Sequence, residues 1–128
     1  MNYAITGDRN YEDQMGVWGT MAGVLAIDPD AHWVLGDCPT GADKFALDAC
    51  IKLDWSYEVH KADWARYRRG AGPKRNTAML DRTDGGVLAF HTNIKRSKGT
   101  KDCVKQALAR GLKVVPCGFH LHELTEEG

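Results

Sequence analysis

The sequence lacks net charge, closely spaced cysteine pairs and long apolar runs. Its 128 residues carry 17 Lys and Arg against 17 Asp and Glu, a balance that argues against a basic coat for nucleic acid. None of the four cysteines forms a C-x-x-C pair, which indicates reduced structural thiols. No stretch approaches about 18 apolar residues, so we expect no membrane partner. The first residues, MNYAITGDRN, do not resemble a signal peptide, and we expect a cytoplasmic location.

Metal ligands are scarce, whereas basic residues gather in two segments. His120 and His122 could contact a metal, but no further ligand follows at a recognisable spacing, so we predict no metal site and no cofactor. Residues 61–75 contain six basic residues against one acid, and residues 95–101 contain four against none. Overall neutrality with two basic loops suggests a local site for an anion.

Short apolar runs alternate with stretches of helical spacing. The runs predict strands at 3–6, 33–36, 55–60, 86–90 and 113–116. The helical stretches lie at 15–25, 42–53, 73–81 and around 104–108. This alternation predicts an α/β protein, a Rossmann-like three-layer sandwich with about five parallel strands and helices on both faces. We expect one domain over residues 1–118 and a loosely held tail over 119–128.

Four loops at one edge of the predicted sheet are unusually rich in glycine and polar residues. Ligands of open parallel sheets bind beyond the carboxyl ends of the strands, and the loops 7–10, 36–43, 61–76 and 91–100 follow strands there. Loops at the opposite edge, such as residues 28–30, are plain turns. This asymmetry predicts a ligand site at the carboxyl edge.

The first two loops contain an arginine and glycines that would let a ligand approach the backbone closely. Gly7 and Arg9 follow the first strand, and Arg9 either binds an anion or pairs with an acid such as Asp43. Gly36 and Gly41 would allow a ligand to approach the start of the next helix, where N–H groups are unpaired. Ala42 lies at the same turn. The alternative is a tight strand-to-helix turn without a ligand.

The third loop combines aromatic and basic residues and is longer than most such loops. Trp64 and Tyr67 could stack on a base, or they could pack over the sheet edge. Gly72-Pro73 resembles an N-cap followed by an N1 proline, so we expect Arg75 and Asn76 in the first helical turn, suited to a phosphate.

The fourth loop ends in Ser97-Lys98-Gly99-Thr100, before the last helix. Thr100 is a good N-cap, and Ser97 and Gly99 with flanking lysines suit a phosphate, although the segment is not a Walker A loop. Simple helix capping is the alternative. A dimer face that includes Trp18 and Met21 is a further alternative, although we expect these residues in the core.

Four motifs occur in order over roughly residues 3–116. They are G-D-R-N-Y, G-D-C-P-T-G-A-D, A-D-W-A-R-Y-R-R-G-A-G-P-K-R-N and S-K-G-T. Together they resemble the YspA-type, cpYpsA-related family of the SLOG superfamily, with forms such as G-S-R, G-G-x-x-G-A-D and A-D-W-x-x-Y-G-x-x-A-G-x-x-R-N. The resemblance implies a Rossmann-like sheet and a nucleotide-derived ligand. The superfamily also includes DNA-processing protein A and the LONELY GUY phosphoribohydrolases, so membership does not choose the activity.

This chain departs from the family forms at two acids. Asp8 stands where Ser is usual and Asp37 where a second Gly is usual. Either a phosphate lies further along the edge, or these carboxylates accept ribose hydroxyls.

Resemblance to the LONELY GUY enzymes is incomplete. Arg75 and Met79 match their R-x-x-x-M pattern, whose Arg is catalytic there, but Cys103 stands at the position of their acid/base Glu. Asp102 is one position away, which is about 100° around a helix. We therefore expect a binding or sensing module for a nucleotide, an ADP-ribose-like compound or a cyclic nucleotide.

Two other functions stay open. A nucleotide hydrolase would use Arg75 and Asp43 as its catalytic candidates, with Asp8 or Asp37 as other sources of a carboxylate. A binder of single-stranded nucleic acid would use basic residues around Trp64 and Tyr67, namely Arg66, Arg68, Arg69, Lys95, Arg96 and Lys98. The predicted ligand-binding residues are Gly7, Arg9, Gly36, Gly41, Ala42, Asp43, Trp64, Tyr67, Arg75, Asn76, Ser97, Gly99 and Thr100.

Overall fold

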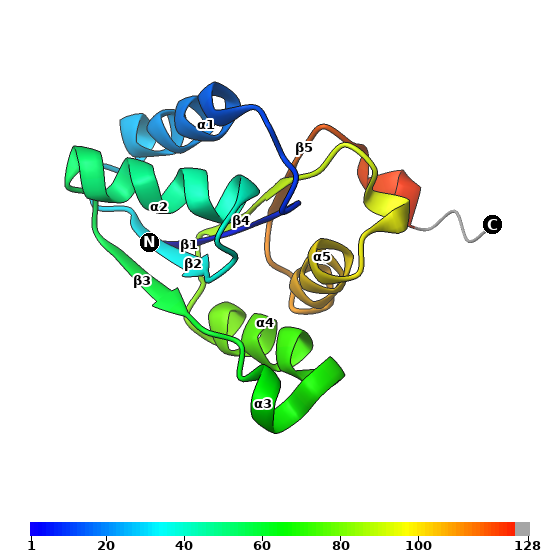
Figure 1. The fold of residues 1–128 in the computed structure, drawn as a ribbon. Coiled ribbons are helices and arrows are strands. Elements are labelled where there is room, and N and C mark those ends of the chain that lie inside the picture. The colour runs from blue at the N-terminus through cyan, green and yellow to red at the C-terminus, as the bar shows by residue number, and fades with distance from the viewer. Residues whose placement is uncertain (125–128) are drawn as a thin grey trace.

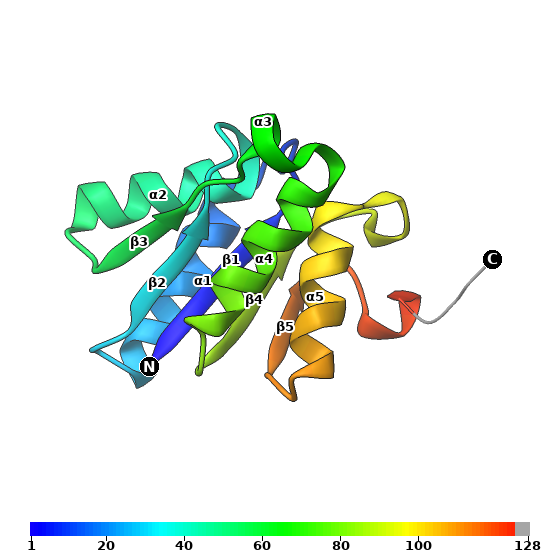
Figure 2. The ribbon, with the colours of Figure 1, turned by 90° about the horizontal axis from the view of Figure 1, so that it is seen from below.

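Five parallel strands form one sheet in the order β3-β2-β1-β4-β5 in the computed structural model, which describes residues 1–124 (Figure 1). The strands are β1 (Asn2–Gly7), β2 (His32–Gly36), β3 (Tyr57–His60), β4 (Gly86–Phe90) and β5 (Val114–Cys117). The main helices are α1 (Gln14–Ile27), α2 (Gly41–Leu53), α4 (Ala71–Asp81) and α5 (Gly99–Ala109). Helices α1 and α2 cover one face of the sheet, and α4 and α5 cover the other (Figures 1 and 2). The predicted Rossmann-like sandwich is confirmed.

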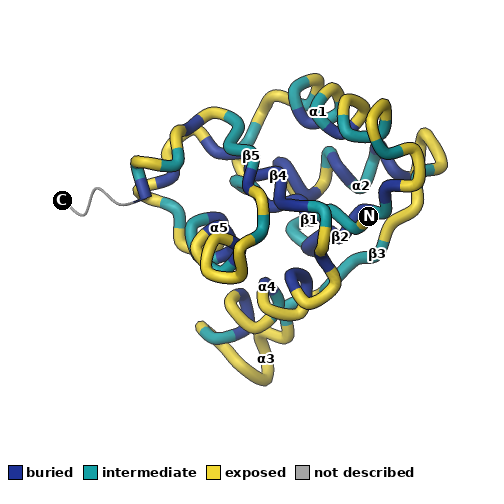
Figure 3. Tube along the Cα trace, turned by 180° about the vertical axis from the view of Figure 1, so that it is seen from behind, coloured by how far each residue is buried: buried dark blue, intermediate teal, exposed yellow. Residues whose placement is uncertain are grey.

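The central strands bury side chains on both faces, which explains their continuous apolar runs. Neighbouring residues such as Ala4 and Ile5 point to opposite faces and belong to separate core clusters. One cluster includes Met79 and Val104 from α4 and α5, and the other includes Met21 from α1. Figure 3 shows the sheet as the buried centre of the molecule. Met21 is fully buried, as expected.

Two helices begin earlier than the sequence pattern predicted. Helix α4 begins at Ala71, so Gly72 is not the N-cap and Pro73 lies further inside the first turn. Proline is tolerated there because the first N–H groups of a helix have no partner within it. Helix α5 begins at Gly99, so Thr100 is not the N-cap; the hydroxyl of Ser97 accepts hydrogen bonds from the amides of Thr100 and Lys101.

The long third loop contains helical turns that the sequence analysis did not predict. A short helix α3 (Trp64–Tyr67) is followed by a 3-10 turn (Arg68–Gly70). The carboxylate of Asp63 caps α3 by accepting from the amide of Arg66. These turns hold Trp64 above the carboxyl edge of the sheet.

The segment after β5 folds back onto the core. Phe119 and Leu124 are buried in the cluster beneath α5, so residues 119–124 of the expected tail pack against the domain. The rings of His120 and His122 stack with centroids 5.5 Å apart. Across residues 1–124 no group of three or more His, Cys, Asp or Glu could hold a metal ion. Within the same residues no helix is both long and apolar enough to cross a membrane.

Candidate functional site

A cleft of about 1000 Å³ opens at the carboxyl edge of the sheet. It lies at the switch point between β1 and β4, where chain connections diverge to opposite sides. Its walls carry more cations than carboxylates. The cationic residues are Arg9, Arg69, Arg75, Arg96, Lys98, Lys101 and Lys105, and the acidic residues are Asp8, Asp43 and Asp102.

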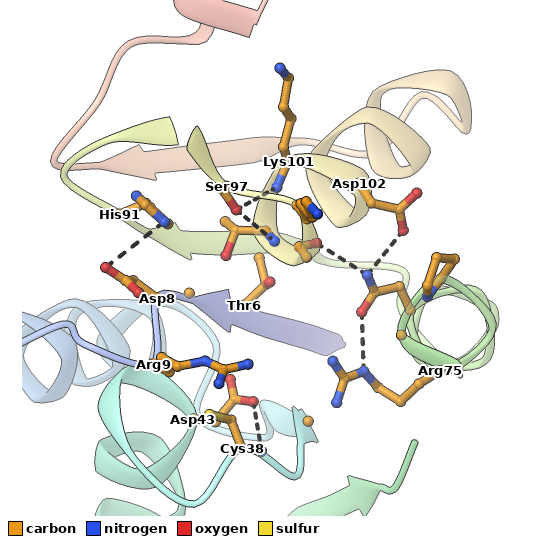
Figure 4. A pocket seen from close by; sticks show the side chains of 18 of the residues that line it. Thr6, Asp8, Arg9, Cys38, Asp43, Arg75, His91, Ser97, Lys101 and Asp102 are labelled. Atoms are coloured by element: carbon orange, nitrogen blue, oxygen red, sulfur yellow. Dashed lines mark hydrogen bonds and ion pairs between the residues drawn. The ribbon is translucent and has the colours of Figure 1, made fainter. Parts of the chain in front are cut away.

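Asp8 and His91 face each other across the switch point (Figure 4). Gly7 and Phe90 are paired in register, so the next residues of β1 and β4 emerge side by side. The Nε2 atom of His91 lies 3.9 Å from Oδ2 of Asp8. The amide of Asn93 donates to Nδ1 of His91, which leaves the hydrogen of the neutral ring on Nε2. Burial lowers the pKa of His91, against the opposing effect of Asp8, and this favours the neutral ring.

Asp43 is a nearly buried carboxyl in the floor of the cleft. It lies in the first turn of α2 with 7% of its surface exposed, and its Oδ2 accepts from the amide of Cys38. Burial raises the pKa of Asp43 to about 6, although the Arg75 guanidinium and the Cys38 amide act to lower it. A Cβ on Gly36 would lie 2.7 Å from the Asp43 carboxylate and 2.9 Å from the Arg75 guanidinium. Glycine at this position therefore lets the acid and the arginine approach each other.

Arg75 and Asn76 connect α4 to the loop after β2 and to the first turns of α5. Nη1 of Arg75 donates to Oδ1 of Asp37 at 2.9 Å, and Nε donates to Oδ1 of Asn76. The amide group of Asn76 donates in turn to the carbonyl of Gly99 and to Oδ2 of Asp102. Asn76 is almost fully buried, so its bonds to α5 fix the spacing of the two helices.

The cleft brings together most of the predicted ligand-binding residues. Those that line it are Gly7, Arg9, Gly36, Asp43, Trp64, Arg75, Asn76, Ser97, Gly99 and Thr100. Arg9 is exposed, and in residues 1–124 its guanidinium pairs with neither Asp43 nor another acid.

Three predicted residues lie outside the lining of this cleft. The amide of Ala42 donates to the carbonyl of Asp8, and Gly41 packs against the backbone of Asp8 and Arg9. The group that approaches the backbone of this turn closely is therefore the loop after β1. The ring of Tyr67 is close to two cations, since the charged groups of Arg66 and Lys74 are 5.1 and 4.8 Å from its centroid.

Sequence reasoning missed His91, Lys105 and the position of Asp102. His91 begins the predicted loop 91–100, so its place at the carboxyl edge was predicted, but its position opposite Asp8 was not. Asp102 lines the cleft despite its offset from the enzyme signature, and its Oδ2 also accepts from Gln106. Cys103 is fully buried, and burial raises its pKa to about 12, so it remains a neutral thiol.

The sheet order and the cleft at its switch point define a Rossmann-like parallel α/β protein. The chain is 31% identical over 123 residues to the Gene 61 protein of Mycobacterium phage D29, an alignment that covers 89% of this chain and 94% of that protein. The chain therefore belongs to the family of this phage protein. No protein-family model matches the chain, and no solved structure matches it.

Proposed function

We propose that the protein binds a nucleotide-derived phosphate ligand in the cleft at the carboxyl edge of the sheet. The observation that carries this proposal is the lining of the cleft, where seven cationic residues outnumber three acids and an exposed tryptophan stands at the rim. Cations and helix N-termini suit phosphate, and an indole face suits a base. The four motifs that resemble the YspA-type SLOG family support the same ligand class.

The start of α5 is the part of the cleft best suited to phosphate. Ser97, Gly99 and Thr100 line the cleft there, together with Lys98 and Lys101. Thr100 is 4% exposed, and no hydrogen bond of its hydroxyl occurs in residues 1–124. The hydroxyl can therefore bind a ligand oxygen without giving up a partner within the chain.

Trp64 is suited to a base at the outer rim. Its side chain is 56% exposed and lines the cleft. A Cβ on Gly72 would lie 3.5 Å from the tip of the ring, so one edge of the indole rests on the start of α4. A ring held at one edge and open on a face can stack on a base without a large change in structure.

A second candidate function is hydrolysis of the bound nucleotide. The observation in its favour is Asp43, whose pKa of about 6 lies close to neutral pH. A carboxyl group with such a pKa can act as a general acid, as glycosidic cleavage requires. Cys103 cannot take this part, because its thiol is fully buried and a pKa of about 12 makes it too weak an acid near neutral pH.

Thermal stabilisation against a panel of ligands tests the proposal. The panel contains nucleoside mono- and diphosphates, ADP-ribose, NAD, cyclic nucleotides and a short single strand, because any ligand of the folded state raises its stability by mass action. Stabilisation by an intact nucleotide is expected. A hit recovered in cleaved form would favour the hydrolase, and stabilisation only by the single strand, lost in salt, would favour nucleic-acid binding. No stabilisation by any of these compounds would contradict the proposal.

A further inference from the structure

The gap between Asp8 and His91 has a donor on one side and an acceptor on the other. The separation of 3.9 Å between Oδ2 of Asp8 and Nε2 of His91 is too long for a direct hydrogen bond. Both atoms can nevertheless reach one oxygen that lies on the cleft side of the pair. Both residues line the cleft, and the Asp8 side chain retains 24% exposure there.

Each member of the pair is held in place by backbone groups. Oδ1 of Asp8 accepts from the amide of Asn10 at 3.0 Å, which turns Oδ2 toward His91. Nδ1 of His91 accepts from the amide of Asn93 at 2.8 Å, which directs the Nε2–H toward the cleft. The backbone amide of His91 is bonded to the carbonyl of Cys117, and this bond anchors the residue to β5. The pair is therefore preorganised.

Of common ligand groups, a hydroxyl best matches this pair. A phosphate oxygen can only accept, and it would meet the negative charge of Asp8. An amino group could donate to Asp8 but would leave the Nε2–H of His91 without an acceptor. A hydroxyl donates to the carboxylate and accepts from the imidazole in the same position.

We infer that Asp8 and His91 form a subsite for a sugar hydroxyl, so that the cleft selects ribonucleotides over deoxyribonucleotides. The inference rests on the proposed function, because it assigns the sugar of the same nucleotide ligand. The subsite lies at the switch point and lines the same cleft as Trp64 and the cationic start of α5.

The test measures the binding of AMP, ADP, GMP and GDP beside their 2′-deoxy and 3′-deoxy forms by calorimetry. The wild-type protein is expected to bind a ribose form at least roughly tenfold more tightly than one of its deoxy forms, as a lost hydrogen bond to a charged group implies. Asp8→Asn removes the charged acceptor, and His91→Asn keeps an acceptor for the Asn93 amide while its shorter side chain places no N–H at the position of Nε2. Both variants are expected to lose most of the preference and to keep their affinity for the deoxy form.

The matched control is Asp48→Asn, which alters an exposed ion pair with Lys44 outside the cleft and should keep the preference. Circular dichroism establishes that each variant is folded. If His91→Asn does not fold, Asp8→Asn alone decides. Equal binding of the ribose form and both deoxy forms by the wild type would overturn this inference alone, as would an unchanged preference in Asp8→Asn. Failure to bind any of these nucleotides would overturn this inference, whereas the proposed function is overturned only if the whole ligand panel, including ADP-ribose, NAD and the cyclic nucleotides, fails to stabilise the protein.

Discussion

Nη1 of Arg75 lies 2.9 Å from Oδ1 of Asp37, so the arginine predicted to bind a ligand anion already has a carboxylate partner within the chain. Its side chain is only 15% exposed. The same guanidinium acts on the buried Asp43, whose pKa it lowers against the effect of burial. Arg75 therefore offsets the negative charge of two acids in the cleft region, and without it their charge would oppose an incoming phosphate.

Arg75→Ala is expected to weaken phosphate binding far more than Arg110→Ala. Loss of Arg75 removes a cation from the cleft and leaves Asp37 without its cationic partner, so we expect the Kd of the nucleotide to rise at least roughly tenfold. Arg110 pairs with Asp81 on the outer surface of α4 and α5 and should change the Kd less than about twofold. A calorimetric titration of both variants measures the difference. Equal effects on the Kd would show that nucleotide binding does not depend on the charge of Arg75.

Asp43 predicts a specific dependence of stability on pH. Its pKa is about 6 in the folded protein against 3.8 for an unperturbed aspartate, so the folded state binds the proton more tightly. Protonation therefore adds stability that is fully present below about pH 4 and is lost as the pH rises through 6. Asp43→Asn should lack this dependence. The stability of the variant relative to the wild type should rise by roughly 1–3 kcal/mol between pH 4 and pH 7.

Urea denaturation of the two proteins at several pH values measures this difference. Titration of the other groups cancels in the comparison, since both chains share them. A constant difference between the two proteins from pH 4 to pH 7 would show that Asp43 titrates normally and would remove the main support for a general acid in the cleft.

Trp64→Ala should affect nucleotides but not a phosphate ligand without a base. Stacking of a base on an aromatic ring contributes roughly 1–3 kcal/mol, so we expect the affinity for ADP to fall about tenfold. Ribose 5-phosphate should bind equally to both proteins. Tyr57→Ala, which removes another exposed aromatic residue on the edge strand β3 outside the cleft, serves as the control. Equal losses for ADP and ribose 5-phosphate would indicate that Trp64 supports the cleft rather than the base.

The fold could be predicted because its signals are local. Strands 86–90 and 33–36 are apolar runs bounded by glycine or charge, and helices 15–25 and 42–53 repeat apolar residues every three to four positions. Helix starts were harder to place, because a proline is compatible with more than one position of a first turn. Pro73 therefore did not reveal that α4 begins at Ala71.

The sheet edge at which the candidate site lies could also be predicted, but the contacts between its side chains could not. The switch-point rule requires only the order of strands and loops, and it placed Arg75, Asn76 and Ser97 at one edge. The bond between Arg75 and Asp37 joins residues 38 positions apart and depends on how α4 packs on the sheet. The pairing of Asp8 with His91 likewise requires β1 and β4 to be neighbours in register.

Gly41 provides a test of how the fold positions the site. Its φ of +72° is left-handed, and a Cβ there would lie 2.6 Å from the carbonyl oxygen of Arg9 and clash with the carbonyl of Asp8. Gly41→Ala should therefore lower the free energy of unfolding by roughly 2–4 kcal/mol. It should also weaken nucleotide binding, because the displaced loop carries Asp8.

The matched control adds the same methyl group to Gly19, in the middle of α1, where a Cβ would meet no atom within 4 Å beyond the backbone of its own helix turns. Gly19→Ala should raise the free energy of unfolding by roughly 0.5–1 kcal/mol, since alanine is the better helix former, and should leave binding unchanged. Urea denaturation and calorimetric titration of both variants measure the two effects. If Gly41→Ala lost stability but bound nucleotides as tightly as the wild type, the loop after β1 would not belong to the ligand site.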